Sequence, residues 1–257
     1  MPQPGGGGPT DLCAVVLSAG EGSRLRPLTL VRPKVLCPVG GTPLVDLAIE
    51  RARTAVGPGA VAVNVHHDRV AVEDHLAGRA HLSVEPGEAR GTAGALGLLR
   101  PWIGGRGTLV LNGDTWAPGD LGAAADGWDR ERLRVLVAGD DRLGPTSSVV
   151  AAFMPWPAVV GLPSTPAGLW EVSWRASLDA GRVDVIRWDG PCRDCGTPAR
   201  YLAANMEASG GHPVVGAGAR VAGSLVRSVV WDGAEVRRGE ALMDAIRTDE
   251  WVTVLVR

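Results

Sequence analysis

Apolar residues in the first half of the chain occur as short continuous runs that alternate with segments of helical spacing. Such runs are typical of buried strands, and the spaced segments are typical of helices with one apolar face. The expected strands are 12–17, 60–65, 81–85 and 108–111, and the expected helices are 43–55, 68–77 and 92–100. This β-α-β-α alternation predicts an α/β fold, a Rossmann-like and mostly parallel sheet with helices on both faces.

The second half of the chain has a less regular pattern. The expected strands are 133–138, 147–153, 168–174 and 182–188, and the expected helix is 197–208. Further on, apolar residues recur at six-residue steps with one nine-residue interval, at Val215, Val221, Val230, Val236 and Leu242. This spacing predicts a few left-handed β-helix-like rungs, with ordinary β-hairpins as the alternative. Because so few rungs are not stable alone, we expect them to pack on the main domain or on a neighbouring subunit.

The composition is that of a globular protein. The 257 residues are 45% hydrophobic, which suffices for one large α/β domain with or without a small appendage. The net charge of −2 and the lack of long charged runs give no sign of a nucleic-acid or anionic-membrane partner. No apolar stretch approaches the roughly 20 residues of a membrane helix, and the N-terminal residues lack the pattern of a signal peptide. We therefore expect a cytoplasmic protein whose residues 1–10 form a disordered lead-in.

The first expected strand ends in a glycine-rich loop over residues 18–29. Gly20 and Gly22 allow backbone conformations in which successive N–H groups point at one anion. Arg24 and Lys34 can then neutralise a polyphosphate. In an open α/β sheet, ligands bind at the carboxyl ends of the strands, which is where this loop lies. The loop is therefore predicted to hold a nucleoside triphosphate.

Two common nucleotide-binding motifs do not account for this loop. Leu25 occupies the third glycine position of a dinucleotide-binding fingerprint, and no GxxxxGK[ST] P-loop occurs in the chain. Lys34 is the only lysine among 26 basic residues, and as a compact point charge it suits a phosphate oxygen. The cysteines do not favour a metal site, because the pair Cys192 and Cys195 lacks a second pair.

Five motifs follow one another along residues 12–208. They are Ser18–Thr29 with Pro33-Lys34, Gly41–Leu44 with Asn64 and His66, Glu85–Leu96, Asn112–Asp114, and Asp194–Leu202. In this order they resemble the signature of the sugar-1-phosphate nucleotidyltransferases, also called NDP-sugar pyrophosphorylases. The Gly-Thr-Ala-Gly-Ala-Leu sequence of residues 91–96 is most similar to that of the mannose-1-phosphate guanylyltransferases and the MurNAc-1-phosphate uridylyltransferases.

The resemblance implies an enzyme that joins a nucleoside triphosphate to a sugar 1-phosphate and releases pyrophosphate. GTP and mannose 1-phosphate are the expected substrates. It implies that Arg24 and Lys34 stabilise the triphosphate and that Asp114 and Asp194 bind Mg²⁺. The expected catalytic residues are Arg24, Lys34 and Asp114, and the other expected nucleotide contacts are Leu17, Ala19, Gly20, Gly22, Ser23, Glu85, Gly91, Thr92 and Asn112. Small residues at 91 and 92 would let backbone groups approach the nucleobase.

The resemblance also divides the chain. It implies a nucleotidyltransferase domain over residues 11–210 and a short C-terminal extension over residues 211–257. We expect the rungs of that extension to provide a contact between subunits of a homo-oligomer.

One feature departs from the family. Its members carry a Glu-Lys-Pro segment whose lysine binds the sugar phosphate, and this chain has no second lysine. Met154 and Pro155 stand near where that segment would fall, Arg175 is a candidate substitute, and Trp116 is a candidate for the wall of the sugar pocket. Two alternatives therefore stay open. One is a regulatory subunit that binds a nucleotide sugar without turnover, and the other is a uridylyltransferase that acts on an amino-sugar 1-phosphate.

Overall fold

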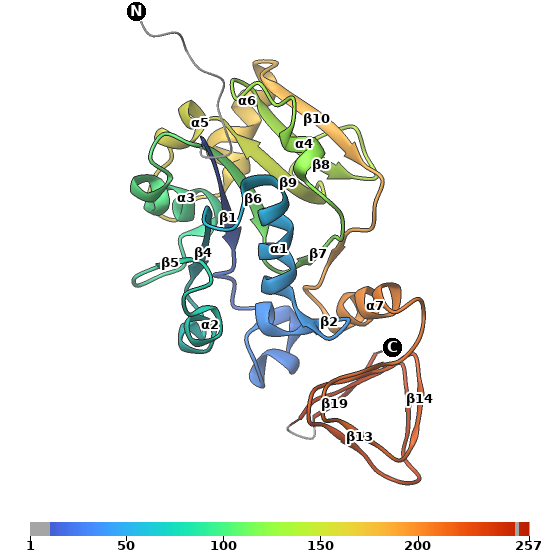
Figure 1. The fold of residues 1–257 in the computed structure, drawn as a ribbon. Coiled ribbons are helices and arrows are strands. Elements are labelled where there is room, and N and C mark those ends of the chain that lie inside the picture. The colour runs from blue at the N-terminus through green and yellow to red at the C-terminus, as the bar shows by residue number, and fades with distance from the viewer. Residues whose placement is uncertain (1–10, 250–251, 257) are drawn as a thin grey trace, which may run out of the picture.

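The computed structural model describes residues 11–249 and 252–256 of the chain (Figure 1). Within them, seven strands form one sheet in the order β10-β8-β9-β6-β1-β4-β5. These strands are β1 (Leu12–Leu17), β4 (Val61–Val65), β5 (His81–Val84), β6 (Gly107–Asn112), β8 (Leu133–Ala138), β9 (Val149–Met154) and β10 (Val183–Trp188). β9 runs antiparallel to β6 and β8, and the other pairs are parallel. The predicted mostly parallel sheet is confirmed, whereas the predicted lead-in lies outside the described residues.

Helices cover both faces of the sheet. The helices of the described residues are α1 (Leu44–Val56), α2 (Arg69–Leu76), α3 (Gly91–Ile103), α4 (Gly122–Ala125), α5 (Trp156–Val160), α6 (Arg175–Asp179) and α7 (Pro198–Ala208). Of these, α7 packs on the short strands Pro38–Val39 and Arg193–Asp194 and beside the C-terminal part of the chain, away from the seven-stranded sheet (Figure 1). Ala14 and Val16 of β1 pack on the α1 side, whereas Cys13 and Val15 pack on the α3 side. This two-sided burial explains why β1 is a continuous apolar run. Among these helices, all within the described residues, none has the length and apolarity needed to span a bilayer.

The expected strand over residues 168–174 is wrong, because this segment is helical. A π-helical turn, Trp170–Trp174, leads directly into α6. Leu169, Trp170 and Trp174 pack into the core on the α3 side, whereas Val172 is 45% exposed. The alternation of Trp170, Val172 and Trp174 is typical of a strand, but the partly buried positions 170 and 174 are one helical turn apart.

The C-terminal part of the chain forms a triangular coil of short strands (Figure 1). The strands are β12 (Val214–Val215), β13 (Arg220–Val221), β14 (Ser224–Val226), β15 (Val229–Val230), β16 (Glu235–Val236), β17 (Ala241–Met243), β18 (Ala245–Arg247) and β19 (Thr253–Leu255). Successive turns of the coil pair in parallel as β12-β15-β18, β13-β16 and β14-β17, and only β19 pairs antiparallel, with β18. Ordinary hairpins are therefore ruled out for these parallel pairs, and the left-handed sense stays a prediction.

The positions at six-residue spacing differ in burial along this coil. Val230, Val236 and Leu242 are buried inside it. Val215 and Val221, which belong to its first turn, are 48% and 39% exposed.

The coil packs on the main domain. Trp231 is fully buried in a cluster that includes Leu25 and Leu28 of the glycine-rich loop and Tyr201 of α7. The Tyr201 hydroxyl accepts a hydrogen bond from Trp231 Nε1 at 3.0 Å and donates one to the carbonyl of Pro38. One apolar cluster thus joins residues on both sides of position 210, so the division of the chain there stays a prediction, as does a homo-oligomer.

Candidate active site

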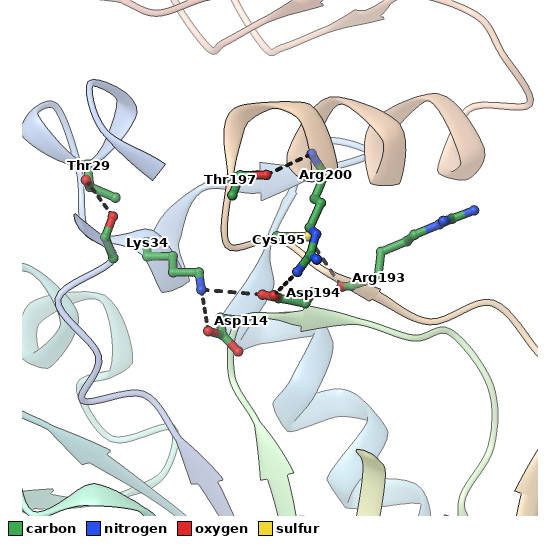
Figure 2. Close-up of polar contacts among 9 residues, drawn as sticks. Thr29, Lys34, Asp114, Arg193, Asp194, Cys195, Thr197 and Arg200 are labelled. Carbon is green, nitrogen blue, oxygen red and sulfur yellow. Dashed lines mark hydrogen bonds and ion pairs between the residues drawn. The ribbon is translucent and has the colours of Figure 1, made fainter. Parts of the chain in front are cut away.

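The glycine-rich loop after β1 is folded by three short 3₁₀ turns, Ser23–Leu25, Leu28–Leu30 and Lys34–Leu36. Gly22 has φ of +69°, and a Cβ built on it would lie 2.9 Å from the Cβ of Lys34. The Thr29 hydroxyl donates to the Gly22 carbonyl at 3.1 Å, which closes the loop (Figure 2). Gly22 is therefore needed both for its left-handed backbone and for the passage of Lys34.

Asp114 and Asp194 lie side by side although 80 positions separate them in the sequence. β7 (Thr115–Trp116) and β11 (Arg193–Asp194) form a two-stranded antiparallel sheet in which Asp194 is opposite Thr115. The backbone N–H of Cys195 donates to the carbonyl of Asp114 at 3.1 Å. Backbone pairing thus fixes the separation of the two carboxylates, as the predicted metal site requires.

Lys34 lies between these two carboxylates. Its Nζ is 2.5 Å from Asp114 Oδ2 and 3.7 Å from Asp194 Oδ1 (Figure 2). The Lys34 side chain is only 7% exposed. The lone lysine is therefore held where a positive charge is surrounded by anionic oxygen atoms.

Arg200 is a site residue that the sequence reasoning missed. Its Nη1 is 2.7 Å from Asp194 Oδ2 (Figure 2). Thr197 caps α7, because its Oγ1 accepts from the Arg200 N–H. A side chain in the first turn of a helix leans back toward the N-terminus, so the Gly-Thr-Pro cap before Arg200 was the signal that could have found it.

Arg24 reaches the same turn. A Cβ built on Gly196 would lie 3.2 Å from Arg24 Nη2 and 2.8 Å from Asp194 Oδ1. Three cationic side chains and two carboxylates therefore gather at the carboxyl edge of the sheet. Such a cluster can bind both a metal ion and phosphate groups.

A cavity of about 220 Å³ opens beside this charged cluster. It is lined by the predicted residues Leu17, Ala19, Gly20, Gly91, Thr92, Asn112 and Asp114, and also by Asn64 and Ala89. We refer to it as the loop cavity. Its walls come from the glycine-rich loop, the start of α3 and the end of β6, which the sequence places far apart.

Glu85 lies beneath the loop cavity and is not among its described lining residues. Its side chain is 3% exposed, and its two oxygens accept from Asn64 Nδ2 at 2.6 Å and from the Arg90 N–H at 2.7 Å. Asn64 Oδ1 in turn accepts from the Ser18 N–H at 2.7 Å. Glu85 thus positions Asn64 and the start of α3, and its nucleotide contact stays a prediction.

The small residues of α3 also have a packing role, whereas the predicted approach of Gly91 and Thr92 to the nucleobase stays a prediction. A Cβ built on Gly91, Gly94 or Gly97 would lie 2.6, 2.5 or 2.0 Å from the carbonyl oxygen of Ala167, Thr165 or Pro163, respectively. Thr92 Oγ1 accepts from the Leu169 N–H at 2.8 Å. These residues let the backbone of segment 163–169 lie directly on the helix.

A second cavity, of about 230 Å³, adjoins the first. The two share Leu17, Thr92 and Asn112. The far wall of the second cavity contains Trp170, Glu171 and Trp174 of the helical segment that follows residue 168. We refer to it as the tryptophan cavity.

The two residues proposed for sugar contacts, Arg175 and Trp116, do not line the tryptophan cavity, and neither does Met154, which stands near where the family's lysine segment would fall. Met154 pairs with Thr108 near the start of β6, at the edge of the sheet opposite Asp114. Trp116 is 8% exposed and packs in the apolar cluster around Tyr201. Arg175 follows Trp174 but is absent from the described lining. The loop over 139–148, between β8 and β9, does line the tryptophan cavity, through Ser147.

Carboxylates are the main candidates for metal binding. In the described part of the chain, no group of three or more His, Cys, Asp and Glu side chains could hold a metal ion. A cation held by Asp114 and Asp194 would therefore take its other ligands from water or from a bound phosphate. This is the coordination that Mg²⁺ favours.

Residues 13–139 match the Nucleotidyl transferase family model. The N-acetylmuramate alpha-1-phosphate uridylyltransferase of Caulobacter vibrioides is 38% identical over 136 residues, which are 48% of this chain and 56% of that protein. The protein of the same name from Neisseria meningitidis serogroup B is 36% identical over 119 residues, 43% of this chain and 50% of that protein. The chain thus spans about half the length of these curated relatives.

The fold itself occurs in solved structures. A structure described as mannose-1-phosphate geranyltransferase from Thermus thermophilus superposes with a TM-score of 0.69 at 22% identity, covering 95% of each chain. This likeness concerns the fold alone. The family match covers just under half of the chain, so residues 13–139 are similar to the nucleotidyl transferase family, and the curated relatives that match this part are named as uridylyltransferases of N-acetylmuramate 1-phosphate.

Proposed function

We propose that the chain transfers a nucleotidyl group from a nucleoside triphosphate to a sugar 1-phosphate and releases pyrophosphate. The observation that carries this proposal is the contact of Lys34 with both Asp114 and Asp194 beside two adjoining cavities. The loop cavity would hold the nucleotide, and the tryptophan cavity would hold the sugar. The reacting phosphates would then meet near Asn112, which lines both.

The chemistry asks mainly for positioning and charge neutralisation. The attacking oxygen belongs to a phosphate that is already ionised, so no general base is required. Two polyanions must approach each other, and the attack must be in line with the leaving pyrophosphate. Lys34 and Arg24 would stabilise the triphosphate and the negative charge that develops on the leaving group.

Asp114 and Asp194 fit a magnesium site. Both are hard oxygen donors, and β7 and β11 hold them side by side. When bound, Mg²⁺ would supply charge neutralisation at the α-phosphate. Lys34 Nζ would then turn from the carboxylates toward phosphate oxygens, since an ammonium group can contact either.

The nucleotide is the first specificity question. The two curated relatives named above are uridylyltransferases, which favours UTP over the GTP suggested by the sequence resemblance. A regulatory subunit without turnover is the less favoured function, because Lys34, Asp114 and Asp194 are all present and in contact.

Pyrophosphate release tests the proposal. The purified chain is incubated with Mg²⁺, each nucleoside triphosphate and a panel of sugar 1-phosphates. We expect release with at least one pair, and its loss when EDTA is added. Binding of a nucleotide sugar without release from any pair would contradict the enzyme and support the regulatory subunit.

A further inference from the structure

We propose that the tryptophan cavity selects sugar 1-phosphates whose sugar part carries no charge and rejects sugars that carry a carboxylate, with Glu171 as the specificity-determining residue. This inference rests on the proposed function, since it concerns the acceptor of that same reaction. It separates the chain from the relatives named above, which act on N-acetylmuramate 1-phosphate. N-acetylmuramate carries a lactyl ether that ends in a carboxylate.

The charge of the cavity is the first argument. Among its described lining residues, Glu171 is the one ionisable side chain. The other polar groups of the lining, Thr92, Asn112 and Ser147, are neutral. A carboxylate accepts hydrogen bonds from sugar hydroxyls, which act as donors. The same carboxylate repels a second carboxylate at short range.

The position of the Glu171 side chain is the second argument. A Cβ built on Gly168 would lie 2.0 Å from Glu171 Oε2, so the carboxylate folds back over Gly168, another residue of the cavity wall. Within the described residues, no hydrogen bond or ion pair to the protein occupies this carboxylate. It is therefore free to accept from a ligand.

No arginine, lysine or histidine is among the described lining residues of the tryptophan cavity. Arg90 donates to the carbonyls of Ser164 and Pro86. Lys34 and Arg200 pair with the aspartates at the carboxyl edge, where Arg24 also lies and where the phosphates would bind. A carboxylated sugar would thus meet Glu171 with no cationic partner in the cavity wall.

The apolar part of the wall agrees with a sugar ring. Trp170 and Trp174 line the cavity beside Val149 and Ala151 of β9. Indole rings offer flat apolar surface to the C–H face of a pyranose, and this contact requires no charge on the sugar.

Matched pairs of acceptors test the inference. The rate of pyrophosphate release is measured as kcat/KM with Mg²⁺ and the preferred nucleotide. Glucose 1-phosphate is compared with glucuronate 1-phosphate, and N-acetylglucosamine 1-phosphate with N-acetylmuramate 1-phosphate. We expect the member without a carboxylate to be preferred at least 100-fold in kcat/KM in each pair. A pair in which only that member reacts also meets this expectation.

Variants then assign the preference. Glu171→Gln is expected to reduce it at least tenfold, because the amide keeps a hydrogen-bond acceptor without the charge. Glu131→Gln removes a carboxylate beside Leu133, at the start of β8, and should leave the preference unchanged. Arg142→Gln examines the loop arginine nearest in sequence to Ser147, and it too should leave the preference unchanged.

The outcomes are distinguishable. Preference for a carboxylated acceptor, or equal rates within a pair, would overturn the inference and leave the proposed function standing. An unchanged preference in Glu171→Gln would overturn the role of Glu171, as would loss of carboxylated turnover in Arg142→Gln. Absence of release with every acceptor would overturn the proposed function and the inference with it.

Discussion

At Lys34, one ammonium nitrogen contacts two carboxylates that come from distant parts of the chain. The side chain is almost fully buried, with Gly22 against its Cβ and Asp114 and Asp194 around its Nζ. Lysine presents three donors around one atom, whereas arginine presents a planar fork that needs more room. A chain with 25 arginines has kept lysine at the one position where the shape of the cation matters.

Lys34→Arg should therefore lower kcat/KM for pyrophosphate release by about 100-fold, the magnitude seen when one donor to a developing charge is lost. Arg26→Lys is the matched control, since Arg26 is exposed and pairs only with Glu21 among the described residues. That control should keep its rate within twofold. A Lys34→Arg enzyme with wild-type kinetics would remove Lys34 from the site.

At the scale of elements, two contacts bring the site together. The β7–β11 pair holds the two aspartates. The glycine face of α3, formed by Gly91, Gly94 and Gly97, packs on segment 163–169, which ends at the tryptophan cavity. Both contacts join pieces that lie far apart in the sequence. Changes on the glycine face should therefore reach the sugar side of the site.

Gly97→Ala tests that face. Alanine favours a helix by about 1 kcal/mol, but a Cβ 2.0 Å from the Pro163 carbonyl forces the backbone apart, which typically costs about 1–3 kcal/mol. We expect a lower free energy of unfolding in urea and a raised KM for the sugar 1-phosphate. Gly161→Ala is the control, because no atom lies within 4 Å of its built Cβ. A stabilised Gly97→Ala protein would show that segment 163–169 does not rest on α3.

At the scale of the whole molecule, the C-terminal coil packs on the glycine-rich loop, because Trp231 lies in one apolar cluster with Leu25 and Leu28. Tyr201 is bonded to both Trp231 of the coil and Pro38 of the main domain. Arg32 lies over the Trp231 ring, 4.2 Å from its centroid. The coil and the nucleotide side of the molecule therefore share one apolar cluster, and loosening one should loosen the other.

Tyr201→Phe removes the shared hydroxyl. The Trp231 N–H then loses its acceptor, whereas the Pro38 carbonyl keeps a hydrogen bond from Asn205 Nδ2 at 3.4 Å. We expect the free energy of unfolding to fall by about 1–3 kcal/mol, the cost of a buried polar group left unpaired. The affinity for the nucleoside triphosphate should fall with it, measured by calorimetry. Unchanged stability would mean that these bonds do not hold the coil in place.

The same cluster predicts sensitivity to alkaline pH. Burial raises the pKa of Cys37 and of Cys195 from 9.0 to about 12, and it raises the pKa of Tyr201 well above 10.0. The folded state thus keeps protons that the unfolded state releases, so stability is full below pH 9 and is lost between pH 9 and 12. Urea unfolding at about pH 8 and about pH 10.5 should show this loss. The variant Cys37→Ala/Cys195→Ala should lose less over that range, and an equal loss in both proteins would contradict the assignment.

Local signals explain what could be predicted from the sequence. The apolar runs predicted the central strands, and the motifs singled out Lys34, Asp114 and Asp194. Both kinds of signal are carried by residues that are close together in the sequence. Arg200 and the roles of Glu85 and Gly91 depend on contacts between distant segments. The Trp170–Trp174 turn was taken for a strand because five residues are too few to separate the two periodicities.

The most direct test follows the α-phosphorus itself. A nucleoside triphosphate labelled at that atom is incubated with Mg²⁺, a sugar 1-phosphate whose sugar part carries no charge, and either the wild-type chain or Asp114→Asn. The label should pass into a nucleotide sugar in step with pyrophosphate release, and Asp114→Asn should lose at least about 100-fold in rate while keeping its fold by circular dichroism. Label that never reaches the sugar, or wild-type transfer by Asp114→Asn, would contradict the account.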